Sequence, residues 1–264
     1  MPVRDFFGEQ AARGAVLILS SLTISAVALA DDPPPPDGKW IGAGQAGLLI
    51  SSGNSDSTSI NAKLNLARTD GPWKNIVYVG GLDGKNNGIV SGEALEGRYE
   101  LDHKISDDLF WFGSADAVRD LFSGFDYQAT IAGGIGYRFL NSDETKLSAT
   151  LGIGYQRLET QTLTKDAAGA VVERSNGPSQ GDLVGTAGLN LEQKLTGTTK
   201  LTDKLFVTSG SLNTNVANDL AVAVSISGEL ALSVGYGIRY NTTPAAGVKK
   251  LDQLTTVNIV YNIK

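Results

Sequence analysis

The feature that most constrains this chain is a two-residue alternation of side-chain character, clearest in residues 127–140, YQATIAGGIGYRFL. Successive side chains of a strand point to opposite faces, so this period predicts a strand with two unlike faces. One face carries the apolar and aromatic set Tyr127, Ala129, Ile131, Gly133, Ile135, Tyr137 and Phe139. The other carries Gln128, Thr130, Ala132, Gly134, Gly136, Arg138 and Leu140. The rest of the chain must decide whether the first face meets a protein core or a lipid bilayer.

The same rhythm runs from Trp40 to Lys264 without a shift that would mark a second domain. Glycine supplies 32 of the 264 residues and proline only 8, so the excess glycine belongs to ordered structure rather than to a disordered chain. Turn signals separate apolar runs and divide the chain into about twelve predicted strands. These lie near residues 42–51, 57–69, 73–83, 91–103, 108–120, 127–140, 145–158, 181–195, 201–211, 214–226, 229–241 and 251–263.

The first thirty residues have the layout of a secretory signal peptide. An arginine-containing start precedes an apolar run over residues 15–29, which ends in Ala28-Leu29-Ala30. We therefore predict a signal peptide over residues 1–30, with a retained membrane anchor as the alternative. Residues 31–39, DDPPPPDGK, then form a Pro-rich periplasmic segment, and residues 40–264 form the folded domain.

Composition excludes several classes of protein. The chain has no cysteine, which excludes a disulfide framework, a thiolate metal site and a cysteine nucleophile. Its net charge is −6 and it has no basic run, so nucleic acid is not an expected partner. Beyond residue 30 no apolar stretch is long enough for a membrane helix.

Three features favour a bilayer over a protein core. The predicted strands match the roughly 9–11 residues of a tilted transmembrane strand, whereas globular strands usually have about 5–6. Short turns follow the even-numbered strands, while longer connections, the longest at 159–180, follow odd-numbered ones. Aromatic residues gather at both strand ends, in one set with Trp73, Trp111, Tyr137, Phe139 and Tyr261, and in another with Phe122, Phe125, Tyr127, Tyr155 and Tyr240. We predict an all-β, transmembrane up-and-down antiparallel barrel of about 12 strands in the cell outer membrane.

The polar faces of these strands would then line a lumen. The lumen-lining candidates are Glu96, Arg98, Glu100, Asp102, Arg138, Gln156, Glu229 and Arg239. They could set the charge selectivity of a narrow pore, or they could pair and close the lumen. A barrel of about twelve strands lies between those filled by side chains and those that leave a channel, so both alternatives stay open.

Apparent chemical motifs have simpler explanations. GAGQAG at residues 42–47 matches a dinucleotide-binding pattern, but no strand precedes it and no helix follows it. SGNSD at 52–56 lacks the acidic ladder of a calcium loop and fits a tight turn through Gly53 and Asn54. His103 is the single histidine, which makes no convincing metal site and, at the predicted periplasmic end, disfavours a lipid-hydrolysing enzyme. We expect no catalytic residue, metal or cofactor.

The chain resembles the YdiY-like salt-induced outer membrane protein family. The resemblance rests on residues 51–67 (SSGNSDSTSINAKLNLA), 97–140 and 251–264 (LDQLTTVNIVYNIK), and especially on FSGFDYQ at 122–128. It implies an outer-membrane barrel with a link to salt or osmotic conditions, and it brings no catalytic residues. Outer-membrane barrels usually end on an aromatic residue, whereas this chain ends with Ile263-Lys264.

The leading functional hypothesis is a small passive pore or envelope protein of salt or osmotic adaptation. The alternative is a closed structural or interaction barrel that acts through its external loops, with 159–180 as the contact surface. Expected partners are outer-membrane lipids, the outer-membrane assembly machinery, and small solutes or ions.

Overall fold

The computed structural model describes residues 38–52, 57–86, 89–120, 125–165, 171–244 and 249–264. The predicted signal peptide, most of the Pro-rich segment, the SGNSD turn and Phe122 lie outside these residues. Twelve strands are formed: β1 (Trp40–Ser52), β2 (Ser57–Asp70), β3 (Trp73–Asn86), β4 (Ile89–Lys104), β5 (Leu109–Asp120), β6 (Phe125–Asn141), β7 (Thr145–Lys165), β8 (Val171–Lys194), β9 (Thr199–Gly210), β10 (Thr214–Ser225), β11 (Leu230–Asn241) and β12 (Leu251–Ile263). Within the described residues, no helix has the length and apolar character needed to cross a membrane.

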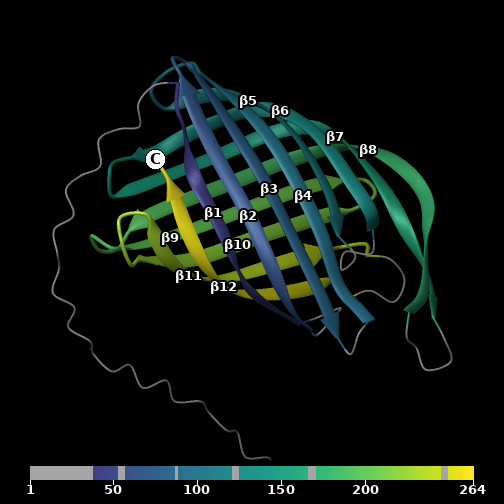
Figure 1. Cartoon of the computed structure of the whole chain (residues 1–264). Coiled ribbons are helices and arrows are strands. Elements are labelled where there is room, and N and C mark those ends of the chain that lie inside the picture. Colours follow the sequence, from purple (N-terminus) through teal and green to yellow (C-terminus); the bar gives the residue numbers. More distant parts are fainter. Residues whose placement is uncertain (1–37, 53–56, 87–88, 121–124, 166–170, 245–248) are drawn as a thin grey trace, which may run out of the picture.

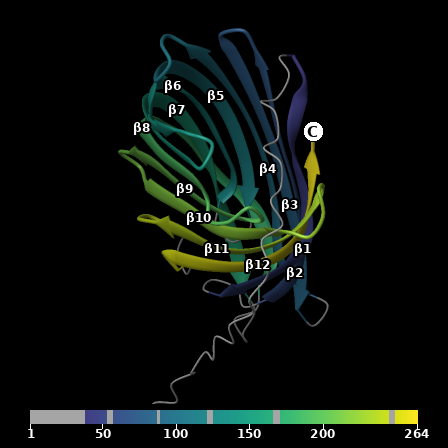
Figure 2. The same ribbon diagram turned by 90° about the vertical axis from the view of Figure 1, so that its left-hand side faces the viewer.

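The sheet closes on itself. Each strand pairs antiparallel with its neighbours in the chain, and β1 pairs with β12 from Gly42–Ile263 to Ser52–Gln253 (Figures 1 and 2). Closure leaves no strand edge, which a sheet needs if its backbone groups are to be satisfied in hydrocarbon. The predicted twelve-stranded antiparallel barrel is confirmed.

The two ends of the barrel differ. The start of β1 and the end of β12 lie at one end, as the pairing of Gly42 with Ile263 shows. The same end carries the connections 71–72, 105–108, 142–144, 195–198 and 226–229. We call it the turn end, and we call the opposite end, where the β7–β8 hairpin extends (Figure 1), the loop end.

The barrel wall is apolar outside and polar inside. Ile131, Ile153 and Leu183 point outward with 71%, 80% and 77% of their surface exposed, whereas Thr130 and Gln156 on the opposite faces are buried. No large side chain among the described residues is completely buried, so the barrel lacks a close-packed apolar core. The large apolar surface that a soluble protein would bury is therefore turned outward.

Two sequence predictions about the wall were wrong. Leu140, expected on the lumen side of residues 127–140, is 50% exposed and pairs with Leu147, because a bulge between Arg138 and Leu140 shifts the alternation. The expected loop at 159–180 is largely strand, because β7 continues to Lys165 and β8 begins at Val171. The sequence pattern did not predict strand here, because the residues are mostly polar or small and form no apolar face.

Inside the barrel, glycines make room for aromatic rings. Phe110 on β5 is buried and lies opposite Gly136 on β6, where an added Cβ would overlap its ring. Gly113 follows Phe112 in β5 and lies on the outward face of the strand, where an added Cβ would meet no other atom. The two glycines therefore differ in what they do for packing, although both lie in the same pair of strands.

We expect Gly136→Val to destabilise the folded barrel by about 1–3 kcal/mol, because the new side chain must displace Phe110 from a filled space. Gly113→Val is the matched control and should change stability little. Urea unfolding of protein refolded in detergent micelles, followed by tryptophan fluorescence, measures both. Equal stability of the two variants would contradict this account of the Phe110 contact.

Candidate functional site: the lumen

The acidic and basic residues of β4 point into the barrel. Glu96, Arg98, Glu100 and Asp102 alternate along the strand, opposite Gly80, Tyr78, Ile76 and Lys74 of β3. Between them, the outward face carries Leu95 and Tyr99, which are 61% and 43% exposed. This strand therefore lines the lumen along most of its length with charge.

Arg98 crosses the lumen. Its guanidinium is 2.7 Å from a carboxylate oxygen of Glu100 on the same strand and 4.8 Å from the ring centroid of Phe206 on β9. β4 and β9 are not neighbours in the sheet, so the cation–π contact spans the interior. The contact therefore connects two sides of the wall that are not adjacent in the sheet.

Like Arg98 and Glu100, Arg239 and Asp219 form a charged pair that points into the lumen. Arg239 on β11 donates two hydrogen bonds of 2.9 Å to the carboxylate of Asp219 on β10. Tyr78 on β3 hydrogen-bonds Glu96 and lies close enough to Asp219 and Arg239 for their charges to act on its hydroxyl. We call Tyr78, Arg98, Phe206, Asp219 and Arg239 together the waist, because they connect β3 and β4 with β9, β10 and β11 across the lumen.

The charged side chains of the waist are only partly buried. The side chains of Arg98, Arg239 and Asp219 keep 29%, 36% and 46% of their surface accessible to solvent. All three point inward, so this exposed surface faces the lumen. The waist is a constriction with polar walls, not a packed core.

Charge is separated across the lumen. The wall of β4 and β5 carries Glu96, Glu100, Asp102 and Asp116, with Arg98 among them. The wall of β7, β8 and β9 carries Lys146, Lys194, Lys200 and Lys204, with Glu192 3.5 Å from Lys200. The two walls of the lumen therefore carry charge of opposite sign, which produces an electric field across the lumen.

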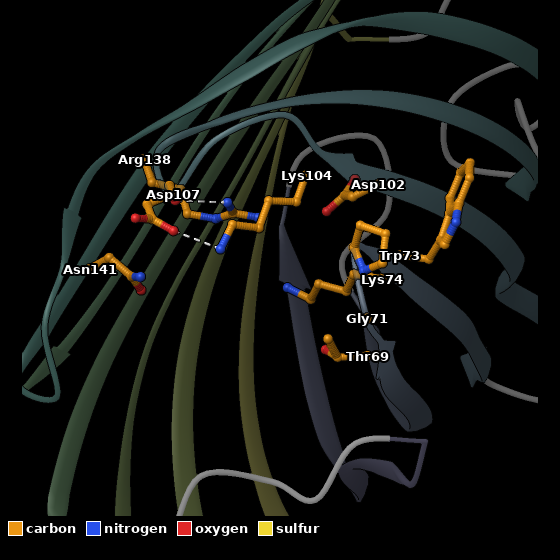
Figure 3. Close-up of a pocket in the computed structure, with 10 residues that line it drawn as sticks. Thr69, Gly71, Trp73, Lys74, Asp102, Lys104, Asp107, Arg138 and Asn141 are labelled. Carbon is orange, nitrogen blue, oxygen red and sulfur yellow. Dashed lines mark hydrogen bonds and ion pairs between the residues drawn. The ribbon is translucent and has the colours of Figure 1, made fainter.

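Three cations converge on a cavity at the turn end. Its volume is about 260 Å³, and Lys74, Lys104, Arg138, Asp102 and Asp107 contribute to its lining (Figure 3). Lys74 and Lys104 come from neighbouring positions of β3 and β4, and Arg138 reaches toward Lys104 from the other side (Figure 3). Lys104 is 2.6 Å from Asp107, while Arg138 donates a hydrogen bond to the Asp107 carbonyl and stacks on Phe110 at 4.5 Å. We call this cavity, which lies at the turn end, the vestibule.

Two of the predicted lumen residues, Gln156 and Glu229, do not point freely into the lumen. Gln156 is buried on β7 and donates a hydrogen bond of 3.2 Å to Thr130, so it joins two strands of the wall. Glu229 lies in the exposed turn before β11, where the hydroxyl of Tyr261 bonds to its carboxylate, so the expectation that it projects into the lumen was wrong. A strand assigned one residue too early produced this error.

Five residues that point into the lumen were not predicted from the sequence. Tyr78 and Asp116 lie on β3 and β5, whose alternation is the least regular in the chain. Lys204, Phe206 and Asp219 lie on β9 and β10, where the alternation of outward leucines and valines could have identified them. The contact of Phe206 with Arg98 joins strands that are not neighbours in the barrel, so it leaves no trace in the local sequence.

His103 belongs to the outer wall. Its ring lies 4.4 Å from that of Trp73 and is stacked on that of Trp111 at 5.5 Å, near the turn end. Trp73 and Trp111 are 38% and 37% exposed, as expected of an aromatic belt at a membrane interface. The described residues contain no cluster of His, Cys, Asp and Glu side chains that could hold a metal ion.

An edge-free antiparallel sheet with an apolar outside and a polar inside defines the class of transmembrane β-barrels. Within that class, residues 44–263 match the family described as "Protein of unknown function, DUF481", and the chain belongs to this family. The uncharacterized protein YdiY of Escherichia coli (strain K12) is 24% identical over 241 residues, which cover 88% of this chain and 87% of YdiY. The resemblance to YdiY-like proteins is thereby confirmed.

Solved barrels are more distant. The NanC porin matches with 10% identity and a TM-score of 0.49, over 84% of this chain and 99% of NanC. The KdgM porin in complex with disordered oligogalacturonate matches with 7% identity and a TM-score of 0.45, over 84% and 99%. The translocator domain of the autotransporter NalP from Neisseria meningitidis matches with 15% identity and a TM-score of 0.45, over 85% and 88%.

The vestibule allows a prediction about pH. The hydrogen bond and charge of the Lys104 ammonium hold the pKa of Asp107, which lies in the turn between β4 and β5, below its ordinary value. The ion pair is therefore complete above the ordinary aspartate pKa of about 3.9 and is lost as the pH falls through the lowered value. The carboxyl ¹³C shift of Asp107 should show this low titration, Lys104→Met should raise the pKa, and Lys146→Met should not. An unchanged pKa in Lys104→Met would refute the assigned cause.

Proposed function

We propose that this protein is a narrow, water-filled pore of the bacterial outer membrane, with its turn end in the periplasm. Support for the location comes from the exposed apolar wall, the aromatic residues near the strand ends, and the placement of the start of β1 and the end of β12 beside the tight turns. Support for the pore comes from the waist, where inward-pointing charged side chains stay accessible to water. Outer-membrane lipids and the outer-membrane assembly machinery are then its partners.

The charge distribution suggests what such a pore would pass. A waist crossed by Arg98 and lined by Asp219 and Arg239 admits ions and small hydrophilic solutes and excludes larger ones. Passive movement of this kind fits the role in salt or osmotic adaptation that the family resemblance implies. The proposal includes no enzymatic step, since the imidazole of His103 lies among tryptophan rings on the outer wall.

A second function is favoured by one observation. The contact between Arg98 and Phe206 crosses the lumen, and the paired charges around it could keep the passage shut. The protein would then act as a closed barrel, with the projecting β7–β8 hairpin as its contact surface. A measurement of conductance in a lipid bilayer distinguishes the two functions, because a closed barrel passes no current.

Refolded wild-type protein in a planar lipid bilayer should give small, discrete conductance steps. Arg98→Ala and Phe206→Ala should each raise the unit conductance, because each removes one half of the contact that crosses the lumen. Arg98→Ala should also shift the reversal potential in a salt gradient toward cation preference, because it removes a positive charge from a constriction rich in carboxylates.

Arg157→Ala is the matched control. Arg157 lies near the loop end, is exposed and bonds to Ser179, so its removal should leave conductance and selectivity unchanged. A silent bilayer for correctly inserted wild-type protein and for both lumen variants would reject the pore and leave the closed barrel.

A further inference from the structure

The outer wall carries a polar pair at mid-height. Asp203 on β9 lies opposite Leu191 of β8 and Leu220 of β10, and residues paired across antiparallel strands share a face. Leu220 is 39% exposed on the outside of the barrel. Asn218, two residues from Leu220 on β10, lies on the same face, opposite Leu205 and Ile238. Asp203 and Asn218 therefore both project from the apolar wall.

Their height places them within the apolar band. Below Asp203, toward the turn end, the outward face of β9 holds Thr199 and Leu201, and above it Leu205, Val207 and Ser209. Asn218 has a similar central position on β10, with Thr214 and Val216 above it and Leu220, Val222 and Val224 below. In contrast, the outward ion pairs Arg68–Asp70 and Arg119–Glu93 lie near strand ends, where headgroups and water are available.

The pair has unused hydrogen-bonding capacity. The side-chain amide of Asn218 donates to a carboxylate oxygen of Asp203 at 2.7 Å and lies 3.4 Å from the carbonyl of Lys204. A carboxylate offers about four acceptor positions, and hydrocarbon supplies no donor for the remainder. Ionisable groups that face lipid are costly and rare, and those that persist usually meet a protein partner.

The surrounding wall permits a partner to approach closely. On β8, Leu189 and Leu191 lie at the height of the polar pair, opposite Leu205 and Asp203, and the small residues Gly185 and Ala187 follow toward the loop end, opposite Ser209 and Val207. Small residues of this kind allow two membrane-embedded surfaces to come into contact. We define the β8–β10 sector by Gly185, Leu191, Asp203, Leu205, Asn218 and Leu220.

We propose that the β8–β10 sector is a self-association surface for a second copy of this chain. An acceptor and a donor that adjoin at one height are self-complementary about a two-fold axis along the membrane normal. Such an axis brings Asp203 to Asn218 of the partner subunit, and Asn218 to Asp203 of the partner subunit. The leucines around the pair then pack against each other. The inference rests on the membrane placement of the proposed function, but not on an open lumen.

The absence of cysteine from the chain makes a direct test possible. Leu220→Cys, in the β8–β10 sector, should give a cross-linked dimer in native envelopes treated with a short bis-maleimide. The control is Leu64→Cys on β2, which lies elsewhere on the wall and is 37% exposed compared with 39% for Leu220. We expect several-fold more dimer from Leu220→Cys, and we expect Asp203→Ala or Asn218→Ala in that background to remove the excess.

Equal cross-linking of the two cysteine variants would overturn the self-association surface. Heat-dependent mobility in gels verifies that each variant is folded, and Asp203→Asn replaces Asp203→Ala if the latter does not fold. A water-soluble maleimide applied to the Leu64→Cys variant tests the membrane placement separately. Protection of Cys at position 64 without preferential dimer formation rejects only the self-association, whereas rapid labelling there rejects the membrane placement itself.

Discussion

The hydrogen bonding between β1 and β12 is the constraint on which the rest of this structure depends. Without it the sheet would have two open edges, and each would expose a row of backbone groups that hydrocarbon cannot satisfy. The seam is made possible by a small residue. A Cβ at Gly47 would overlap the backbone of Val257 and the side chain of Asn258, so glycine allows the two strands to meet closely there. Closure then fixes, for every strand, which face looks outward.

Once the sides are fixed, the interior follows from limited space. Glycine, alanine, serine and threonine occupy much of the inner wall, and phenylalanines such as Phe110 fill the gaps that glycine leaves. The interior also holds charged groups: Asp219 and Arg239 form an ion pair there, and both side chains keep part of their surface exposed. In this way the same composition that permits curvature also leaves a lumen in which charged groups can face each other.

The sequence contained most of the fold but only part of the site. A period of two predicts strands, their faces and, with strand length, a membrane barrel. It failed at Leu140, because a bulge is a single-residue irregularity that alternation cannot locate. It also failed at 159–180, because the residues there are mostly polar or small and show no apolar alternation. The charges of β4 were predicted, whereas the contact of Arg98 with Phe206 was not. That contact depends on which strands the closed circumference places opposite each other, and a local pattern carries no such information.

The inner and outer features meet on β9. Lys204 and Phe206 face the lumen from this strand, while Asp203 and Leu205, which alternate with them, face outward. A strand cannot shift its outer side chains without moving its inner ones, since both are attached to one hydrogen-bonded backbone. A partner that holds Asp203 and Asn218 would therefore also fix the position of the Phe206 ring that Arg98 meets. Self-association and the width of the waist would then be coupled through the rigidity of a single strand pair, without any mobile element between them.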